Sequence, residues 1–256
     1  MTGHDGGADR LLPDLDDARQ LLGRDGALVV LTGAGMSAES GVPTFRDAQT
    51  GLWERYDPTA LATPEAWAHD RETVWAWYRW REHLISGAQP NAGHLAVSRA
   101  QADREVTVVT QNVDDLHERA GSRVVHHVHG SLFAHRCDTC AAPVQVGPPP
   151  AEPAERLTPP PCDRCEGRAR PGVVWFGEML PTEPWEKAVS AVTTAAAVLV
   201  VGTSGLVHPA ASLPGLAAER GTPVVEVNPG PSGLGAEVSV HLRATAGEAL
   251  PALLEA

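Results

Sequence analysis

The sequence has few of the features that place a chain in a membrane or outside the cell. Its apolar runs, such as Ala195–Val201, are far shorter than the ~20 residues that cross a bilayer. The opening residues, Met1–Arg10, are rich in Gly and Asp and lack the charged-then-apolar pattern of an export signal. We therefore predict a soluble, cytoplasmic protein with no membrane partner.

Basic residues are also scarce. Lys and Arg total 20 against 32 Asp and Glu, which leaves a formal net charge of −12 with His neutral. This charge argues against a nucleic-acid partner and is compatible with Lys-rich protein partners. Apolar residues make up 43% of the 256 residues and charged residues only 20%, so the chain is not a disordered acidic one. The length predicts one or two domains with a sizeable core, and we expect a monomer.

Cysteine is rare, but its spacing is informative. The 4 cysteines form two C-x2-C pairs, Cys137 with Cys140 and Cys162 with Cys165. Four thiolates in such pairs suit a closed tetrahedral Zn²⁺ site, which is structural because no ligand position is left for water. The Pro-rich stretch between the pairs cannot build a core of its own, so we expect the metal to hold it. Two disulfides are the alternative, which a reducing cytosol disfavours.

Strand-like and helix-like segments alternate along most of the chain. Strands are expected at 27–31, 105–110, 123–128, 172–176, 198–201 and 223–227, and helices at 11–22, 91–102, 114–120, 184–195 and 210–220. This alternation predicts an α/β fold with a doubly wound, mostly parallel sheet. Two segments interrupt it, the cysteine segment and a mostly helical, Trp-rich stretch at 49–81. We expect these two segments to form a second, smaller domain.

Small or amide residues follow four of the expected strands. These strand ends are the Gly-rich turn 32–37, Gln111-Asn112, Gly202-Thr203-Ser204 and Asn228. Ligands of open α/β sheets bind at the carboxyl ends of the strands, and this set suits a nucleotide with two phosphates and two riboses. A tight structural turn is the alternative for Gly33-Ala34-Gly35, because Ala38 stands where the dinucleotide fingerprint has its third Gly.

Two single residues are candidates for chemistry. His129 ends an expected strand and precedes Gly130, where an imidazole can act as a general base near neutral pH. Arg46 follows a Pro-containing loop and can anchor a phosphate or a carboxylate. Each also has a simpler interpretation, a structural histidine and a surface arginine.

Taken together, these segments resemble the sirtuin family of NAD-dependent protein-lysine deacylases. The resemblance covers about residues 21–228, and the cysteine quartet lies where the family carries its zinc. The motifs that carry it are Gly33–Ser37 with Ser40–Arg46, Thr110–Asp114, His129-Gly130, Val174–Glu178 and Gly202–Ser204.

The resemblance implies a Rossmann-like doubly wound parallel sheet with a smaller domain made of a zinc-ribbon module and a helical module. It assigns residues 10–47, 92–135 and 171–256 to the NAD-binding domain. The helical module then spans 48–91, and the zinc-binding module spans 136–170. NAD and the acyl-lysine are expected to enter the cleft between the two domains.

The resemblance also implies a reaction and its residues. The acyl oxygen attacks the nicotinamide ribose carbon, and the products are free lysine, nicotinamide and 2′-O-acyl-ADP-ribose. His129 is implied as the general base on a ribose hydroxyl, with Phe45 shielding the reacting centre. The implied NAD-binding residues are Gly33, Ala34, Gly35, Ser37, Phe45, Arg46, Gln111, Asn112, Asp114, Gly202, Thr203, Ser204 and Asn228. The implied substrate-binding residues are Val174, Trp175, Phe176, Gly177 and Glu178, besides the pair discussed next.

Tyr78 and Arg81 bear on the acyl group. They are three residues apart in an expected helix and so share a face, where a phenol beside a guanidinium can bind a free carboxylate. The pair resembles the Tyr-x-x-Arg of the sirtuin branch that removes succinyl, malonyl and glutaryl groups, and Thr44 and Ala48 agree with that branch. An aromatic packing face with a solvated Arg81 is the alternative. We predict a preference for succinyl-lysine, with deacetylation as a second activity.

Other functions stay open at this point. A deacetylase without acidic-acyl preference and an NAD-dependent ADP-ribosyltransferase are possible on the same fold, although the complete motif at 111–114 and His129 favour deacylation. A non-enzymatic alternative is a zinc-ribbon binding module with a nucleotide sensor.

Overall fold

The centre of the molecule is a six-stranded parallel sheet with the strand order β3-β2-β1-β6-β7-β8. The computed structural model describes residues 12–42, 51–54 and 56–255. Every residue of β1 and β6 is buried, as expected for central strands covered on both faces. The strands are β1 Leu28–Thr32, β2 Val106–Thr110, β3 Val125–His127, β6 Ala197–Val201, β7 Val224–Val227 and β8 Val240–Leu242.

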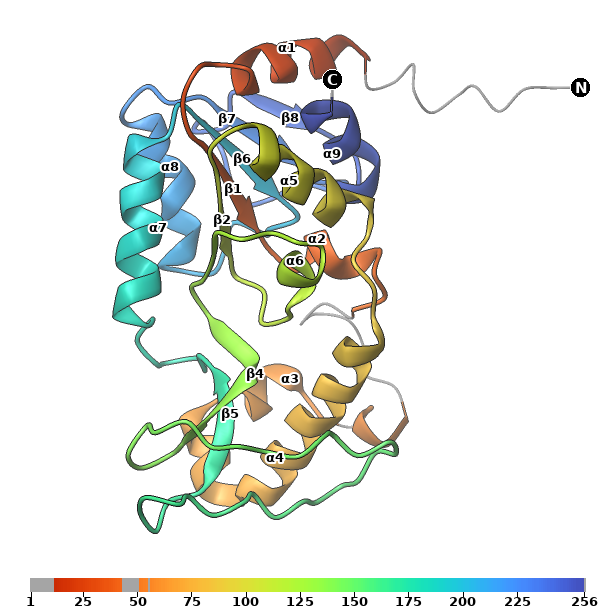
Figure 1. The fold of residues 1–256 in the computed structure, drawn as a ribbon, viewed down its shortest axis with the longest axis vertical. Helices are drawn as coiled ribbons and strands as arrows, with labels where there is room; N and C mark the ends of the chain where they lie inside the picture. The colour runs from red at the N-terminus through yellow and green to blue at the C-terminus, as the bar shows by residue number, and fades with distance from the viewer. Residues whose placement is uncertain (1–11, 43–50, 55, 256) are drawn as a thin grey trace, which may run out of the picture.

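Helices cover both faces of this sheet (Figure 1). Alternate residues of β1 point to opposite sides, so Leu28 and Val30 join one apolar cluster and Val29 and Leu31 join the other. The first cluster is covered by α1 Leu12–Leu22, α5 Ala92–Asp103 and α9 Ala246–Leu254. The second is covered by α7 Thr182–Thr194, the 3-10 turn η3 Ala210–Ser212 and α8 Leu213–Ala218. The predicted doubly wound Rossmann-like sheet is confirmed.

A second region lies beyond the carboxyl ends of the strands, in the lower half of Figure 1. Its two strands form an antiparallel pair, and its core is a Trp-rich cluster that we call the tryptophan cluster. The elements are η2 Gly51–Trp53, α3 Pro58–Leu61, α4 Pro64–Gly87, β4 Gly130–Cys137 and β5 Ala169–Val173. The large rings of the cluster are Trp53, Trp67, Trp75, Trp77, Tyr78 and Trp175.

Helix α4 carries most of these rings and has two signals that shape it. Thr63 caps its start by accepting a hydrogen bond from the Ala66 N–H at 3.1 Å. Asp70 interrupts it with non-helical φ and ψ of −147° and 75°. The Asp70 carboxylate accepts from the N–H and the hydroxyl of Thr73, at 3.3 and 2.9 Å, and so acts as a second cap after the kink. The remaining turns present an uninterrupted buried surface to the cluster.

The structure corrects some expected boundaries. The strand expected at 172–176 is β5, which ends at Val173 and pairs antiparallel with β4 instead of joining the parallel sheet. The helix expected at 210–220 is divided into η3 and α8, because Pro214 has no N–H to donate within a continuous helix and is tolerated in the first turn of α8. In the described part of the chain, none of the helices combines the length and apolar character that crossing a bilayer requires.

Candidate active site

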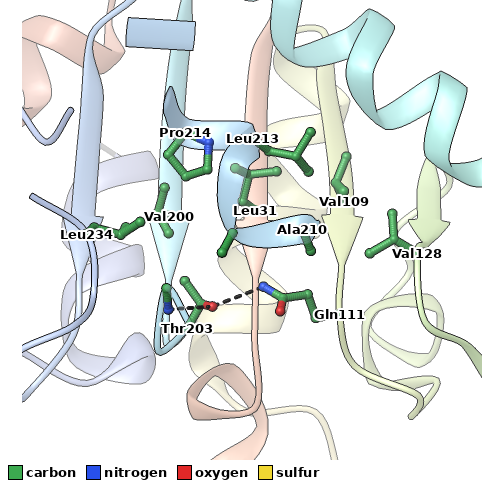
Figure 2. Close-up of a pocket in the computed structure, with 12 residues that line it drawn as sticks. Leu31, Val109, Gln111, Val128, Val200, Thr203, Ala210, Leu213, Pro214 and Leu234 are labelled. Atoms are coloured by element: carbon green, nitrogen blue, oxygen red, sulfur yellow. Dashed lines mark hydrogen bonds between the residues drawn. The ribbon is translucent and has the colours of Figure 1, made fainter. Parts of the chain in front are cut away.

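Polar side chains that follow β2, β6 and β7 are tied to one another at the sheet edge. Gln111, after β2, donates from Nε2 to Thr203 Oγ1 at 3.0 Å, as Figure 2 shows. Asn228, after β7, donates from Nδ2 to the Thr203 carbonyl at 2.8 Å. Thr203 follows β6, so the bonds link the ends of β2, β6 and β7. The structure therefore brings together residues that are far apart in the sequence, as parallel strands require.

A small apolar pocket lies behind this first link, beneath η3 and α8. It is lined by side chains such as Leu31, Val109 and Val200, and among the described residues only Gln111 and Thr203 add polar side chains to it (Figure 2). The Gln111–Thr203 bond thus separates an apolar interior from the polar strand ends.

A second polar group lies beside the turn after β1. Asn112 donates from Nδ2 to Ser37 Oγ at 3.1 Å, and Ser37 donates in turn to Asp114 Oδ2 at 2.9 Å. All three side chains are buried, with Asp114 only 4% exposed. Burial raises the pKa of Asp114, although the N–H of Leu116 and the Ser37 hydroxyl partly oppose the rise. The group offers amide, hydroxyl and carboxyl atoms within one small volume.

Two buried histidines pack beside this second polar group, and the sequence analysis did not identify either of them. His94 and His117 are fully buried, with ring centroids 4.8 Å apart. His117 Nε2 lies 3.3 Å from Thr32 Oγ1, which itself donates to Thr110 Oγ1 at 2.8 Å. Burial lowers the pKa of His94 to about 4 and that of His117 well below its usual value, so both rings are neutral. In the sequence, the only signal for these two histidines is a position shortly after a helix cap or a turn. That signal does not distinguish them from other residues.

His129 lies at the same edge in a defined tautomer. Its Nδ1 lies 3.1 Å from the Gln111 carbonyl oxygen, which can only accept, so Nδ1 carries the proton. Nε2 is then left with a lone pair. Burial lowers the pKa of His129, and the bond to Gln111 opposes this only in part. A neutral imidazole with an available nitrogen is the form that a general base requires.

The neighbouring His127 is in the opposite charge state. Its Nδ1 lies 3.0 Å from the Asn112 carbonyl and its Nε2 lies 2.7 Å from a Glu118 carboxylate oxygen. Both partners accept, so both nitrogens donate. Burial lowers the pKa of His127, but the bond and charge of Glu118 outweigh burial and raise it overall. His127 therefore holds the backbone of Asn112 in place, a role that its sequence position did not indicate.

The glycines of the first turn and of the β6 turn pack against each other. A Cβ on Gly202 would lie 2.5 Å from the carbonyl carbon of Gly35, and Gly202 has a φ of +60°. A Cβ on Gly33 would lie 2.8 Å from the Gly202 carbonyl oxygen. These glycines let the ends of β1 and β6 approach closely, which supports the tight-turn interpretation. Ala34 lies between two of them, and the Ser204 hydroxyl accepts from the Leu206 N–H at 3.4 Å.

The segment after β5 carries one exposed ring and one buried ring. Phe176 is 48% exposed, whereas Trp175 is 2% exposed and belongs to the tryptophan cluster. Val174 donates its N–H to the His129 carbonyl at 2.8 Å, which joins this segment to the sheet edge. Gly177 provides the turn, with a φ of +86°. Glu178 returns its carboxylate to the Trp175 N–H at 2.9 Å and so lies inward, not toward an open surface.

Tyr78 and Arg81 lie together in the tryptophan cluster. They are 3% and 6% exposed, so the alternative of a solvated Arg81 is wrong. Trp175 donates its indole N–H to the Tyr78 oxygen at 3.0 Å. The Arg81 guanidinium carbon lies 5.1 Å from the centre of the Trp77 ring. Burial raises the pKa of Tyr78 above its usual range, so its hydroxyl is neutral and able to donate.

A network of buried charged residues on α4, next to Tyr78 and Arg81 in the sequence, was not predicted. Arg79 donates to Glu82 Oε2 at 2.5 Å and also donates to the Gly147 carbonyl of the Pro-rich segment. His135 of β4 lies 3.1 Å from the same Glu82 oxygen. The Arg79 and Glu82 side chains are only 4% and 9% exposed. The network ties α4 to β4 and to the cysteine segment.

The four cysteine sulfurs lie within 4.8 Å of one another. Cys137 and Cys165 are 3.5 Å apart at Sγ, and Cys140 and Cys162 are 3.8 Å apart. Tetrahedral zinc with Zn–S bonds of ~2.3 Å places its sulfurs ~3.8 Å apart, so the quartet fits one zinc ion. Disulfides would need ~2.05 Å, and all four thiols are free. The N–H of Gly167 donates to Cys165 Sγ at 3.3 Å, which stabilises a thiolate.

Residues 33–209 match the family model described as the Sir2 family. The chain belongs to the Sir2 family. This sirtuin is 54% identical over 229 residues to a protein of Mycobacterium tuberculosis (strain ATCC 25618 / H37Rv) named NAD-dependent protein deacylase, covering 89% of this chain and 96% of that protein. A Corynebacterium glutamicum protein of the same name is 51% identical, covering 88% of this chain and 89% of its own.

Solved structures agree with this family. A Sir2 homologue in complex with NAD is 45% identical and superposes with a TM-score of 0.87, covering 94% of this sirtuin and 92% of that chain. A mutant Sir2 homologue with ADP-ribose is also 45% identical, with a TM-score of 0.85 and coverage of 94% and 95%. Four predicted positions of this sirtuin, Thr44, Phe45, Arg46 and Ala48, lie outside the described residues.

Proposed function

We propose that this sirtuin is a protein-lysine deacylase that uses NAD to remove succinyl and malonyl groups, and acetyl groups as a second activity. NAD-dependent protein deacylation is the common activity named for its curated relatives, which match nearly the full chain. The acidic-acyl preference rests on Tyr78 and Arg81. The acylated lysine of a protein is the substrate, and the products are free lysine, nicotinamide and 2′-O-acyl-ADP-ribose.

The donors and acceptors at the sheet edge fit NAD chemically. The Ser37 hydroxyl lies within hydrogen-bond distance of both the Asn112 amide and the Asp114 carboxyl, and these groups can hold ribose and carboxamide groups. Gln111 and Thr203 offer a further amide and hydroxyl at the ends of β2 and β6. NAD supplies an electrophilic ribose carbon with nicotinamide as the leaving group.

The remaining residues are assigned to NAD binding, substrate binding and zinc binding. The residues assigned to NAD at the strand ends are Gly33, Ala34, Gly35, Gly202, Ser204 and Asn228, and the resemblance adds Phe45 and Arg46. Residues Val174–Glu178 bind the substrate segment through their backbone and through Phe176. Cys137, Cys140, Cys162 and Cys165 hold zinc structurally.

His129 carries the proton transfer in this proposal. Its Nδ1 proton is committed to the Gln111 carbonyl, so Nε2 accepts a proton from a ribose hydroxyl. Because burial lowers the pKa of His129, the ring is neutral before the transfer. The Val174 N–H donates to the His129 carbonyl and so fixes the His129 backbone relative to the substrate segment.

The observation that carries the acyl preference is a neutral phenol and a guanidinium buried side by side on α4. Tyr78 and Arg81 are both buried on α4 and lie three residues apart, which puts them on one face of the helix. A carboxylate at the end of an acyl chain accepts from both groups, through a charge-assisted bond from Arg81 and a hydroxyl bond from Tyr78. An acetyl group offers no such acceptor. A buried cation such as Arg81 also favours a substrate with an anionic end, because a buried charge is costly without a partner of opposite sign.

Two domains are expected around this cleft. Residues 10–47, 92–135 and 171–256 form the NAD-binding domain, 48–91 the helical module and 136–170 the zinc-binding module. Separate apolar clusters for the sheet and for the tryptophan region support the division, and β4 and β5 connect the two across the boundaries. We expect a cytoplasmic monomer without a membrane partner, and the acidic composition argues against a nucleic-acid partner.

The experiment is to measure kcat/KM for succinyl-, malonyl- and acetyl-lysine peptides of one sequence, for the wild type and for Arg81→Met. Loss of a charge-assisted hydrogen bond of ~1.5–3 kcal/mol should lower desuccinylation about 10- to 100-fold. Deacetylation should change less than about threefold, because acetyl makes no bond to the guanidinium. Equal losses on all three peptides would contradict the carboxylate role of Arg81. Mass spectrometry of the peptide would reveal ADP-ribose transfer if that were the reaction.

A further inference from the structure

Trp175 is held in place from three directions. Its ring face lies 3.4 Å from the guanidinium carbon of Arg170, a close cation–π contact. Its backbone N–H donates to Glu178 Oε2 at 2.9 Å, and its indole N–H donates to the Tyr78 oxygen at 3.0 Å. The side chain is 2% exposed, so it has little freedom to adopt another position.

Arg170 and Glu178 are themselves fixed by a two-point ion pair. Arg170 Nη1 and Nη2 donate to the two carboxylate oxygens of Glu178 at 2.6 and 2.9 Å. Burial opposes ionisation of Glu178, but the bonds from Arg170 and from the Trp175 N–H lower its pKa, so it stays anionic. A paired fork of this kind resists rotation of either partner. The indole is therefore positioned by contacts from β5 and from the turn after it.

The indole N–H determines what the Tyr78 hydroxyl can do. A phenol oxygen keeps its proton near the ring plane, which leaves two orientations for the O–H bond. The Trp175 N–H occupies one of these directions, because a donor must face a lone pair and not a proton. Tyr78 has no acceptor for its own proton among the residues that the structure describes. Its O–H is thus directed away from Trp175 and is available to a ligand.

We propose that Trp175 is a specificity-determining positioning residue, whose indole N–H holds the Tyr78 hydroxyl as a donor toward the acyl carboxylate. The proposal rests on the acidic-acyl preference proposed above and extends it to three residues outside α4. Trp175 acts through Tyr78, and Arg170 and Glu178 act through Trp175. Acetyl groups gain nothing from this arrangement because they carry no terminal carboxylate.

The first test is Trp175→Phe, which keeps an aromatic ring and removes the N–H. Steady-state kinetics with succinyl- and acetyl-lysine peptides of one sequence should show KM for the succinyl peptide raised about 3- to 10-fold, the value of one hydrogen bond. The kcat for that peptide and the KM for the acetyl peptide should each change less than about twofold, because the substitution alters neither the reacting atoms nor the backbone and Phe176 to which substrate-segment binding is assigned. A general packing defect would instead lower kcat for both peptides together.

Trp67→Phe is the matched control. Its ring centroid lies 5.6 Å from that of Trp175, and its indole N–H donates to Asp138 Oδ2 at 3.1 Å instead of to Tyr78. The substitution removes the same chemical group from the same cluster. The ratio of succinyl to acetyl kcat/KM should therefore stay at the wild-type value. If Trp175→Phe lowers the melting temperature too far for assay, benzothienylalanine at position 175 keeps the bicyclic shape without the N–H.

A double-mutant cycle with Tyr78→Phe tests whether Trp175 acts through the Tyr78 hydroxyl. If Trp175 acts only through the Tyr78 hydroxyl, the double variant has the same succinyl KM as Tyr78→Phe alone. Additive losses, or a Trp175→Phe enzyme with an unchanged acyl ratio, would overturn the inference while leaving the proposed function intact. A wild type without desuccinylase activity would overturn both together.

Discussion

The two sides of the candidate site are built in different ways. On the sheet side, polar residues that follow parallel strands bond in pairs, Asn112 with Ser37 and Gln111 with Thr203. On the tryptophan side, Tyr78 and Arg81 are held by large rings and buried charges from distant segments. In the proposed function, the sheet side binds the cofactor, which every substrate shares, whereas the tryptophan side distinguishes one acyl group from another. A change on the sheet side should therefore affect all substrates alike, and a change on the other side should alter their order.

The largest effect is expected from His129→Ala on the sheet side. Removing a general base should lower kcat by about 10²- to 10⁴-fold, equally for succinyl and acetyl peptides. Nicotinamide release measures both. His126→Ala is the control. His126 lies in β3, just before His129 in the sequence, and takes no part in the hydrogen bonds of the candidate site described above. Retention of activity within tenfold of the wild type would remove His129 from the chemistry.

Arg79→Met probes the tryptophan side. It leaves the Glu82 carboxylate buried without its cation, which should destabilise the protein by about 3–5 kcal/mol. Urea unfolding monitored by tryptophan fluorescence measures the change. A second variant that also carries Glu82→Leu should recover part of the loss, because it removes the stranded charge. A fluorescence midpoint unchanged by Arg79→Met would show that the ion pair contributes nothing to this region.

Gly202→Ala tests the close approach of β1 and β6. The added Cβ would lie 2.5 Å from Gly35 at a φ of +60°, so we expect a loss of about 1–3 kcal/mol in the free energy of unfolding. Gly215→Ala, in α8 with no atom within 4 Å of the added Cβ, should be neutral or slightly stabilising. Equal stability of the two variants would mean that the strand ends can separate without cost.

The smallest effect is a shift in pH dependence. Burial lowers the pKa of His129, and a general base works only above its pKa. The acid limb of kcat/KM should therefore lie below the ordinary histidine value of 6.5, for succinyl and acetyl peptides alike. A pH–rate profile between about pH 4.5 and 9 measures it. An acid limb above 6.5 would contradict a neutral, buried His129.

The sheet side could be predicted from the sequence because its geometry is local. Each of Gln111, Gly202 and Asn228 directly follows a run of β-branched residues, and parallel strands place such ends along one edge. The strand β8 and helix α9 were not predicted, because the segment before them is irregular and rich in Gly and Pro. The cysteine spacing predicted the zinc quartet for a similar reason. Each C-x2-C pair is local in the sequence, and each pair needs only the other pair to complete the site.

The supports of the tryptophan side were beyond sequence analysis. The bond from Trp175 to Tyr78 joins positions 97 residues apart, and no periodicity relates them. Arg79 and Glu82 were not singled out in the sequence, yet they pair inside the core with His135. Glu178 was expected among the substrate-binding residues, but its carboxylate is bound by Arg170 and the Trp175 N–H. Long-range contacts of this kind appear only when the chain is folded.

The most direct test of the account is the wild-type reaction with succinyl-lysine and acetyl-lysine forms of one peptide, with NAD in excess. Nicotinamide release gives kcat/KM for each, and mass spectrometry identifies the second product. We predict a higher kcat/KM for the succinyl peptide and formation of 2′-O-succinyl-ADP-ribose. An equal or higher kcat/KM for the acetyl peptide would contradict the role given to Tyr78 and Arg81.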